Sequence, residues 1–144
     1  MKIVPYKGWE TCYRLANDKV EVIVTGEVGP RVICFGFLDA PNEFFENEKQ
    51  LGKSGDDEWH DYGGHRLWHA PEERPRTYAP DNDPITVEEE AGATRFIQPV
   101  EATTGIQKEM VIAIDSEAAH VTVTHRLRNT NLWAVELAPW ALSV

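Results

Sequence analysis

The sequence contains little cysteine, little positive charge and no long apolar run. Its two cysteines, Cys12 and Cys34, lack metal-ligand spacing, so we expect reduced thiols and a cytoplasmic protein. The first residues, MKIVPYKGWE, lack the apolar stretch of a secretion signal, and no segment is apolar for long enough to span a membrane. Fourteen basic residues stand against 24 acidic ones, a net charge of −10. This charge opposes binding to nucleic acids and to anionic membranes.

The sequence also lacks a helical period of useful length, and apolar residues instead recur at every second position. A chain of 144 residues suits one domain. We therefore predict one all-β domain over residues 1–144, an antiparallel β-sandwich with roughly eight to ten strands. The expected strands are 20–25, 31–37, 65–70, 85–90, 93–101, 106–115, 120–127 and 135–144.

Short links join strand 85–90 to 93–101 and strand 106–115 to 120–127. We therefore expect the two strands of each pair to be antiparallel neighbours. Pro139 indicates an edge position or a bulge in the last strand. Residues 48–61 are polar and predict a surface loop. One face of 106–115 is apolar apart from Lys108, and one face of 120–127 is apolar apart from His125: the two faces carry Ile106, Met110, Ile112, Ile114, Val121, Val123 and Leu127.

Residues 63–82, GGHRLWHAPEERPRTYAPDN, concentrate titratable and aromatic side chains. His65 and His69 would converge on a metal ion if they lay on a helix. The glycine pair before them and Pro71 after them leave room for only six residues, which favours a strand. Four residues of strand separate the two Cα atoms by roughly 13 Å, too far for one zinc ion to hold both rings. We therefore expect no metal site and no cofactor.

In an extended HRLWHA segment, His65 and His69 lie on one face of the strand and Arg66 and Trp68 on the other. Histidine suits proton transfer near neutral pH, so the first face is a candidate acid–base site. The alternative is that each imidazole is a hydrogen-bonded structural group. His125 has the same two interpretations: a buried neutral side chain with a local partner, or part of the floor of a cleft.

Three prolines predict that residues 71–82 form a stiff loop without a regular element, and long loops on a rigid scaffold often carry binding groups. Arg74 and Arg76 could form bidentate hydrogen bonds with a carboxylate or with vicinal hydroxyls of a ligand. Asp81 and Asn82 could bind a ligand in the same way, or could form an Asx turn before Pro84.

Aromatic residues cluster in sequence around the two histidines. Aromatic faces beside a few polar groups suit pyranose rings, although packing in the core is the commoner fate of tryptophan. The residues around the histidines are Trp59, Tyr62, Trp68 and Tyr78, and Trp133 and Trp140 follow near the end of the sequence.

Several segments together resemble an uncharacterised branch of the galactose mutarotase-like (aldose 1-epimerase-like) superfamily. They are GPRVICFGF, YGGHRLWHAPE, RTYAPDNDPI, QPVEATTGIQKEM and VTHRLRNTNLWAVELAPWALSV, which cover most of the chain from about residue 28. The resemblance implies a large β-sandwich of which this chain is the N-terminal portion, as the apolar ending APWALSV also suggests. It further implies sugar binding on a concave face and epimerisation at the anomeric carbon by a carboxylate and a histidine.

The family's His-Gly-Gly motif corresponds here to Tyr62-Gly63-Gly64, followed by His65. By their position beside this segment, rather than by a matched motif, we take His65, His69 and Glu72 as the candidate catalytic residues. The candidate residues for binding a sugar or uronate are Arg66, Trp68, Arg76, Tyr78, Asp81, Asn82, His125 and Trp140.

Two other functions fit the same residues. The chain could be a non-catalytic carbohydrate-binding module, in which these side chains hold a glycan without reaction. It could instead be a structural half-domain that associates with a second copy, or with a C-terminal half, through an exposed sheet edge.

Overall fold

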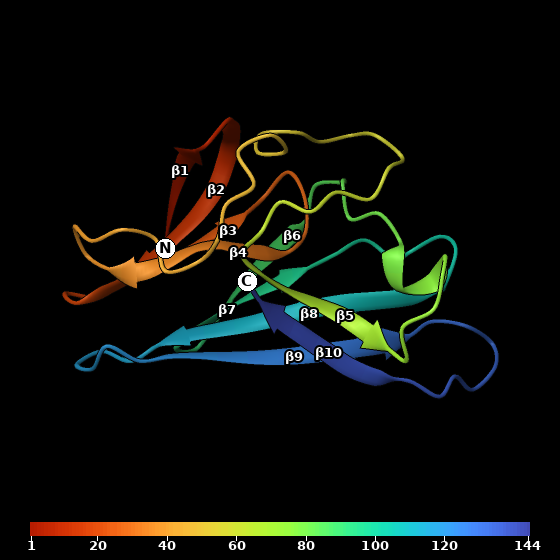
Figure 1. Cartoon of the computed structure of the whole chain (residues 1–144). Helices are drawn as coiled ribbons and strands as arrows, with labels where there is room; N and C mark the ends of the chain where they lie inside the picture. The colour runs from red at the N-terminus through yellow and green to blue at the C-terminus, as the bar shows by residue number, and fades with distance from the viewer.

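The computed structural model describes residues 1–144 and forms two antiparallel sheets packed face to face (Figure 1). This confirms the all-β, sandwich-like fold predicted from the sequence. The six-stranded sheet has the order β1-β2-β3-β4-β5-β10, and the four-stranded sheet has the order β6-β7-β8-β9. The bounds are β1 Lys2–Tyr6, β2 Trp9–Ala16, β3 Val20–Thr25, β4 Arg31–Phe37, β5 His65–Ala70, β6 Thr86–Glu90, β7 Ala93–Ile97, β8 Ile106–Ile114, β9 Val121–Asn129 and β10 Ala138–Ser143.

Strand β5 is the predicted HRLWHA strand, and it lies between β4 and β10. Strand β10 is an edge strand in which Pro139 stands opposite His69, so the predicted edge position of Pro139 is confirmed. The expected strand at 135–144 was too long, because residues 135–137 belong to the loop before Ala138. The loop that covers residues 48–61 contains no strand, as predicted.

The four-stranded sheet contains both predicted hairpins. Glu90 pairs with Ala93 across the first turn, and Ile114 pairs with Val121 across the second. Strand β7 ends at Ile97, so residues 98–101 are loop and not the strand end that the sequence suggested.

The main core lies between the sheets. Leu67 of β5 packs there with Phe96, Met110 and Ile112 of the other sheet, and all four are buried. A second cluster, around Trp9 and Tyr62, packs on the opposite face of the six-stranded sheet. The long connection between β4 and β5 covers this second face (Figure 1).

Two elements depart from the expectations. The N-terminal hairpin of β1 and β2 was not among the predicted strands. The loop expected to be irregular throughout contains one 3-10 turn, η1, at Arg76–Tyr78. No helix in the structure has the length and apolarity that crossing a membrane requires.

Candidate functional site

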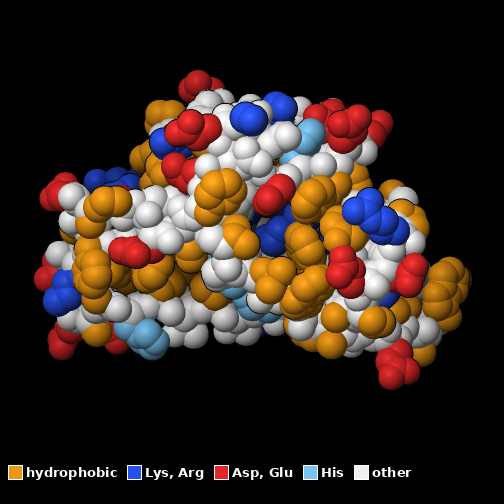
Figure 2. All heavy atoms as spheres, in the orientation of Figure 1, with side chains coloured by type: hydrophobic (Ala, Val, Ile, Leu, Met, Phe, Trp, Pro, Cys, Tyr) orange, Lys and Arg blue, Asp and Glu red, His pale blue; other side chains and the backbone are white.

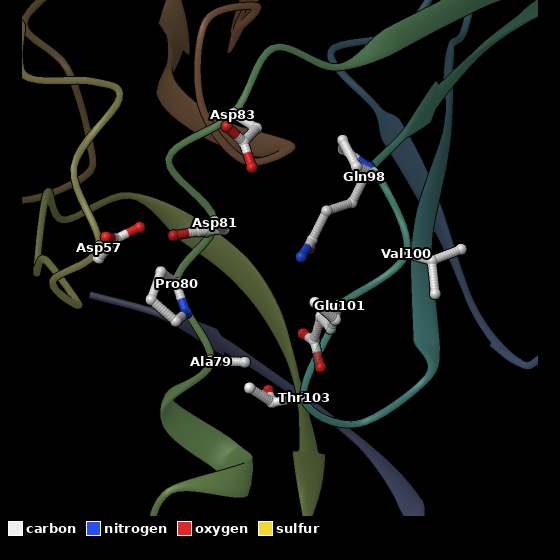
Figure 3. A pocket seen from close by; sticks show the side chains of 11 residues that line it. Asp57, Ala79, Pro80, Asp81, Asp83, Gln98, Val100, Glu101 and Thr103 are labelled. Atoms are coloured by element: carbon white, nitrogen blue, oxygen red, sulfur yellow. The ribbon is translucent and has the colours of Figure 1, made fainter. Parts of the chain in front are cut away.

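A cavity of about 330 Å³ lies between two loops at one end of the sandwich (Figure 3). One wall is residues 79–83, which follow η1, and the other is residues 98–103, which connect β7 to β8. Asp57, from the connection between β4 and β5, completes the rim. We call this space the polar cavity, and its lining residues are Asp57, Ala79, Pro80, Asp81, Asp83, Gln98, Pro99, Val100, Glu101, Ala102 and Thr103.

Asp81 forms part of one wall and is held by two arginines. Its Oδ2 atom lies 3.2 Å from an Nη2 atom of Arg31, which donates a hydrogen bond, and 3.2 Å from Nη2 of Arg66. Burial disfavours the charged carboxylate, but Arg66 and Arg31 outweigh this effect and lower the pKa of Asp81 below its ordinary value. Asp81 is therefore an ionised carboxylate at neutral pH, although it is only 5% exposed.

Glu101 forms part of the opposite wall and is held by side chains from β5 and β8. Lys108 Nζ lies 2.5 Å from Glu101 Oε1, and His69 Nε2 lies 3.3 Å from Glu101 Oε2. Thr104 donates a hydrogen bond to the same carboxylate. Burial acts to raise the pKa of Glu101, but its partners His69 and Lys108 reverse the effect and lower the pKa. Burial also lowers the pKa of Lys108.

The polar cavity contains a hydrogen-bonding group that has no partner in the protein. Gln98 is buried, its amide extends into the space between the two loops (Figure 3), and it makes no side-chain hydrogen bond. Asp81 Oδ1 also lacks a hydrogen-bond partner, but it is closed off from the cavity, and the Asp81 carboxylate points away from Gln98 (Figure 3). Buried polar groups in proteins are normally paired, so the Gln98 amide indicates a place for a polar ligand or for ordered water.

Four of the six predicted aromatic residues gather on the face of β5 opposite to His65 and His69. Trp68 packs edge-to-face on Trp59 and Trp140, with ring centroids 5.9 and 5.1 Å apart. Tyr78 packs against Trp59 and Trp68 at 5.2 and 5.5 Å. We call these four residues the aromatic cluster. Figure 2 shows hydrophobic side chains gathered over β5 and β10, around a recess in which Lys or Arg atoms are visible.

Arg66 lies beneath the aromatic cluster, with its guanidinium carbon 4.7 Å from the centre of the Trp68 ring. The side chain is almost completely buried, and none of its nitrogens makes a hydrogen bond of good geometry, despite the ion pair with Asp81. Burial lowers the pKa of Arg66 to about 10, so the group stays charged at neutral pH. Because Tyr78 immediately precedes the wall at residues 79–83, the aromatic cluster fixes that wall against β5.

Asn82 connects the cavity loop to the connection between β4 and β5. Its amide donates to the backbone oxygens of Asp56 and Glu58, and its oxygen accepts a hydrogen bond from Tyr62. Asp81 and Asn82 were expected either to bind a ligand or to form an Asx turn. In the structure, Asn82 instead holds the cavity loop against the connection between β4 and β5 through these hydrogen bonds. Asp81 lies in the cavity wall.

The three candidate catalytic residues do not converge. His69 is fully buried behind Glu101, between the sheets. His65 also points between the sheets, where its Nε2 atom lies 2.9 Å from Nε2 of His125. Glu72 is exposed on the loop after β5 and accepts a hydrogen bond from the Tyr78 hydroxyl. The face of β5 that carries His65 and His69 is thus an internal face of the sandwich.

One interpretation of His125 was a buried side chain with a local partner. Its partner is instead His65, which belongs to the other sheet. The pair with His65 borders a second cavity of about 300 Å³, which is lined mainly by valine and phenylalanine. Burial, and then His125, lower the pKa of His65 to about 4, and burial lowers the pKa of His125.

The remaining candidates lie outside the polar cavity. Arg76 donates a hydrogen bond to the backbone oxygen of Pro71, and the guanidinium of Arg74 lies over the ring of Tyr78. Neither arginine forms the expected bidentate contact with a carboxylate. Trp140 belongs to the aromatic cluster, whereas Trp133 is exposed on the loop before β10.

Gln98, Glu101 and Arg31 were not among the residues singled out from the sequence. One signal could have led to Glu101: Lys108 stands on an otherwise apolar face, and a buried lysine needs an acidic partner. Nothing in the sequence marks Gln98, because a glutamine in a loop has no characteristic pattern.

The structure contains no group of three or more His, Cys, Asp and Glu side chains arranged to hold a metal ion. No protein-family model matches the chain, and the comparisons with curated proteins and with solved structures found no match.

Proposed function

We propose that this chain binds a sugar in the polar cavity. The observation that carries the proposal is the buried Gln98 amide, which extends into a space of about 330 Å³ and makes no side-chain hydrogen bond. That volume is at the small end of ligand sites and suits a single sugar ring better than a long glycan.

The chemistry of the walls fits a polyhydroxylated ligand. The carboxylates of Asp83 and Glu101 can accept hydrogen bonds from hydroxyls, and the Gln98 amide can both donate and accept. Ala79, Pro80 and Val100 supply apolar surface for the C–H face of a ring. The resemblance to mutarotase-like proteins agrees with this ligand class, although the cavity lies away from the internal face with His65.

The test is a titration of the chain with glucose, followed by amide chemical shifts. We expect millimolar binding, with shifts confined to residues 79–83 and 98–103. Gln98→Ala should weaken binding by about tenfold, because it removes one or two hydrogen bonds. The matched control is Gln107→Ala, since Gln107 lies on β8 outside the cavity. Unchanged affinity in Gln98→Ala, or shifts centred on His65, would contradict the proposal.

A second candidate function is epimerisation at the anomeric carbon, and Glu101 favours it. This carboxylate is ionised, borders the cavity and contacts His69 and Lys108, which could exchange protons with it. Polarimetry separates the two functions. Faster interconversion of anomers that Glu101→Gln abolishes would support catalysis, whereas binding without faster interconversion would support a binding module.

A further inference from the structure

The cavity beside the pair of His65 and His125 lies between the two sheets and is mainly apolar. We call it the apolar cavity. Its volume is about 300 Å³, and its lining residues are Val22, Val32, Phe35, Phe44, His65, Val121, Val123, His125 and Ser143. Protein interiors leave few voids larger than a water molecule, so an apolar space of this size indicates a binding site.

The apolar cavity extends from the core toward the surface. Val22 and Val32 are buried, whereas Val121 and Val123, on the facing strand β9, are only half-buried. All four side chains pack in or against the main core between the sheets. The partial exposure of the β9 side chains therefore means that a small molecule can enter from solvent.

One wall of the apolar cavity is aromatic. The ring centroids of Phe35 and Phe44 are 5.8 Å apart, and the Phe44 ring stacks on His65 at 6.4 Å with an angle of 22° between the ring planes. Aromatic rings pack favourably on other aromatic rings. An apolar cavity of about 150 Å³ is large enough for benzene, so the volume here suits a ligand with one ring.

The polar groups of the apolar cavity come from β5, β9 and β10. His65 Nε2 lies 2.9 Å from His125 Nε2, and His65 Nδ1 lies 2.8 Å from the Ser143 hydroxyl oxygen. A hydroxyl can donate one hydrogen bond and accept two, so Ser143 can form a further hydrogen bond. Ser143 is also exposed, and a ligand can therefore reach it.

The apolar cavity contains no fixed charge. No Lys, Arg, Asp or Glu side chain lines it. Burial lowers the pKa of His125 and, together with His125, lowers that of His65 to about 4, so both rings are neutral at neutral pH. A charged ligand would lose its hydration here and meet no opposite charge.

We propose that the apolar cavity binds a small uncharged aromatic molecule that carries a hydroxyl group, a phenol. The ring of the ligand lies between the aromatic wall and the valines of β9, and its hydroxyl forms a hydrogen bond with Ser143. This site and this ligand class are separate from the polar cavity and its sugar.

The experiment compares phenol with benzoate, which has the same ring but is ionised at about pH 7. The chain is titrated with each compound, and amide chemical shifts are followed. We expect phenol to bind in the millimolar range, with shifts centred on the lining residues of the apolar cavity. Benzoate should bind at least about tenfold more weakly, because its carboxylate finds no cation.

Two variants test the position of the site. Val123→Phe places a ring in the cavity and should abolish phenol binding. The matched control is Thr124→Phe, which adds the same ring to the exposed face of the same strand and should leave the affinity unchanged. Ser143→Ala, at an exposed position, should weaken phenol binding several-fold while benzoate stays weak.

The folded state of each variant is checked by thermal unfolding. If Val123→Phe does not fold, the shift map and Ser143→Ala decide. The proposal is overturned if phenol does not bind at 10 mM, an arbitrary upper limit of about ten times the expected constant. It is also overturned if the shifts centre on Trp68 and Trp140, if folded Val123→Phe binds phenol as the original chain does, if Ser143→Ala binds phenol unchanged, or if benzoate binds as tightly as phenol.

Discussion

The carboxylate of Asp81 lies within 3.2 Å of two guanidinium groups, those of Arg31 and Arg66, and all three side chains are nearly removed from water. Asp81→Asn would leave both arginines charged and unpaired in the interior. We expect a loss of about 3 kcal/mol in the free energy of unfolding, measured by denaturant titration.

The matched control for this change is Asp83→Asn. Asp83 lines the same cavity but is exposed and unpaired, so its substitution should change the stability by less than about 0.5 kcal/mol. Equal effects of the two substitutions would show that the arginines do not depend on Asp81.

The pair of His65 and His125 predicts an acid-sensitive contact between the sheets. The pKa of His65 is lowered to about 4, first by burial and then by His125, whereas an unfolded histidine titrates near about 6.5. The unfolded chain therefore binds more protons in this range, and stability falls as the pH is lowered from about 6.5 toward about 4. Asp81 and Glu101, whose pKa values are also lowered, lose their contribution at lower pH, below about 4.

Replacing both histidines, by His65→Leu with His125→Leu, should flatten the loss of stability between about pH 6.5 and 4. Thermal unfolding followed at several pH values measures the slope. The exposed His120, changed to Gln, is the control and should leave the slope as it is. A double variant that loses stability as steeply as the original chain would show that the acid sensitivity lies elsewhere.

Among single residues, sequence patterns predicted the direction of side chains better than their partners. Lys108 was correctly placed on the inward face of β8, and the histidines of β5 were correctly placed on a common face. Lys108 contacts Glu101 of the loop before its own strand, whereas His69 and His65 contact Glu101 and His125 of the other sheet. Such contacts depend on how the sheets stack, which no local pattern encodes.

At the level of single elements, the start of β5 is the most constrained point of the fold. Gly64 has a φ angle of +74°, and a Cβ atom there would overlap the carbonyl oxygen of Val32 on the neighbouring strand. Gly92 in the turn between β6 and β7 has a similar φ of +78° but open space around it. The two glycines thus share a left-handed backbone conformation and differ in crowding.

Gly92→Ala should cost only about 1 kcal/mol of stability, the penalty for a left-handed residue with a side chain. Gly64→Ala should cost at least about 3 kcal/mol of stability, because strands β4 and β5 must also move apart to make room for the new Cβ atom. Denaturant unfolding of both variants measures the difference. Similar values for the two would mean that the chain near Gly64 relaxes freely.

The strands that were predicted show either alternation, as in β9, or a continuous apolar run, as in β3 and β4, which are buried on both faces. The two hairpins of the four-stranded sheet were assigned from their short turns. The β1–β2 hairpin was missed for two reasons. No residue of Lys2–Tyr6 is fully buried, and the buried residues of β2 fall at Trp9, Cys12 and Leu15, three positions apart. Neither strand shows the period of two on which the prediction relied.

For the whole molecule, the sandwich brings together two loops that are about twenty residues apart in sequence, and the polar cavity lies between them (Figure 3). The sequence indicated that the loop at residues 71–82 carries binding groups, and the structure places Asp81 in the cavity wall. It did not indicate the second wall, because residues 98–101 were expected to continue a strand, and residues 98–103 reach the first wall only through the stacking of the sheets. The candidate site was therefore half predictable.

The account depends on the polar cavity as the place where a sugar binds. A crystal structure of the chain grown with glucose tests this most directly. We predict that the ring lies between residues 79–83 and 98–103, with a hydroxyl within hydrogen-bond distance of the Gln98 amide. A ring bound instead over Trp68 and Trp140, or beside His65 and His125 between the sheets, would contradict the account.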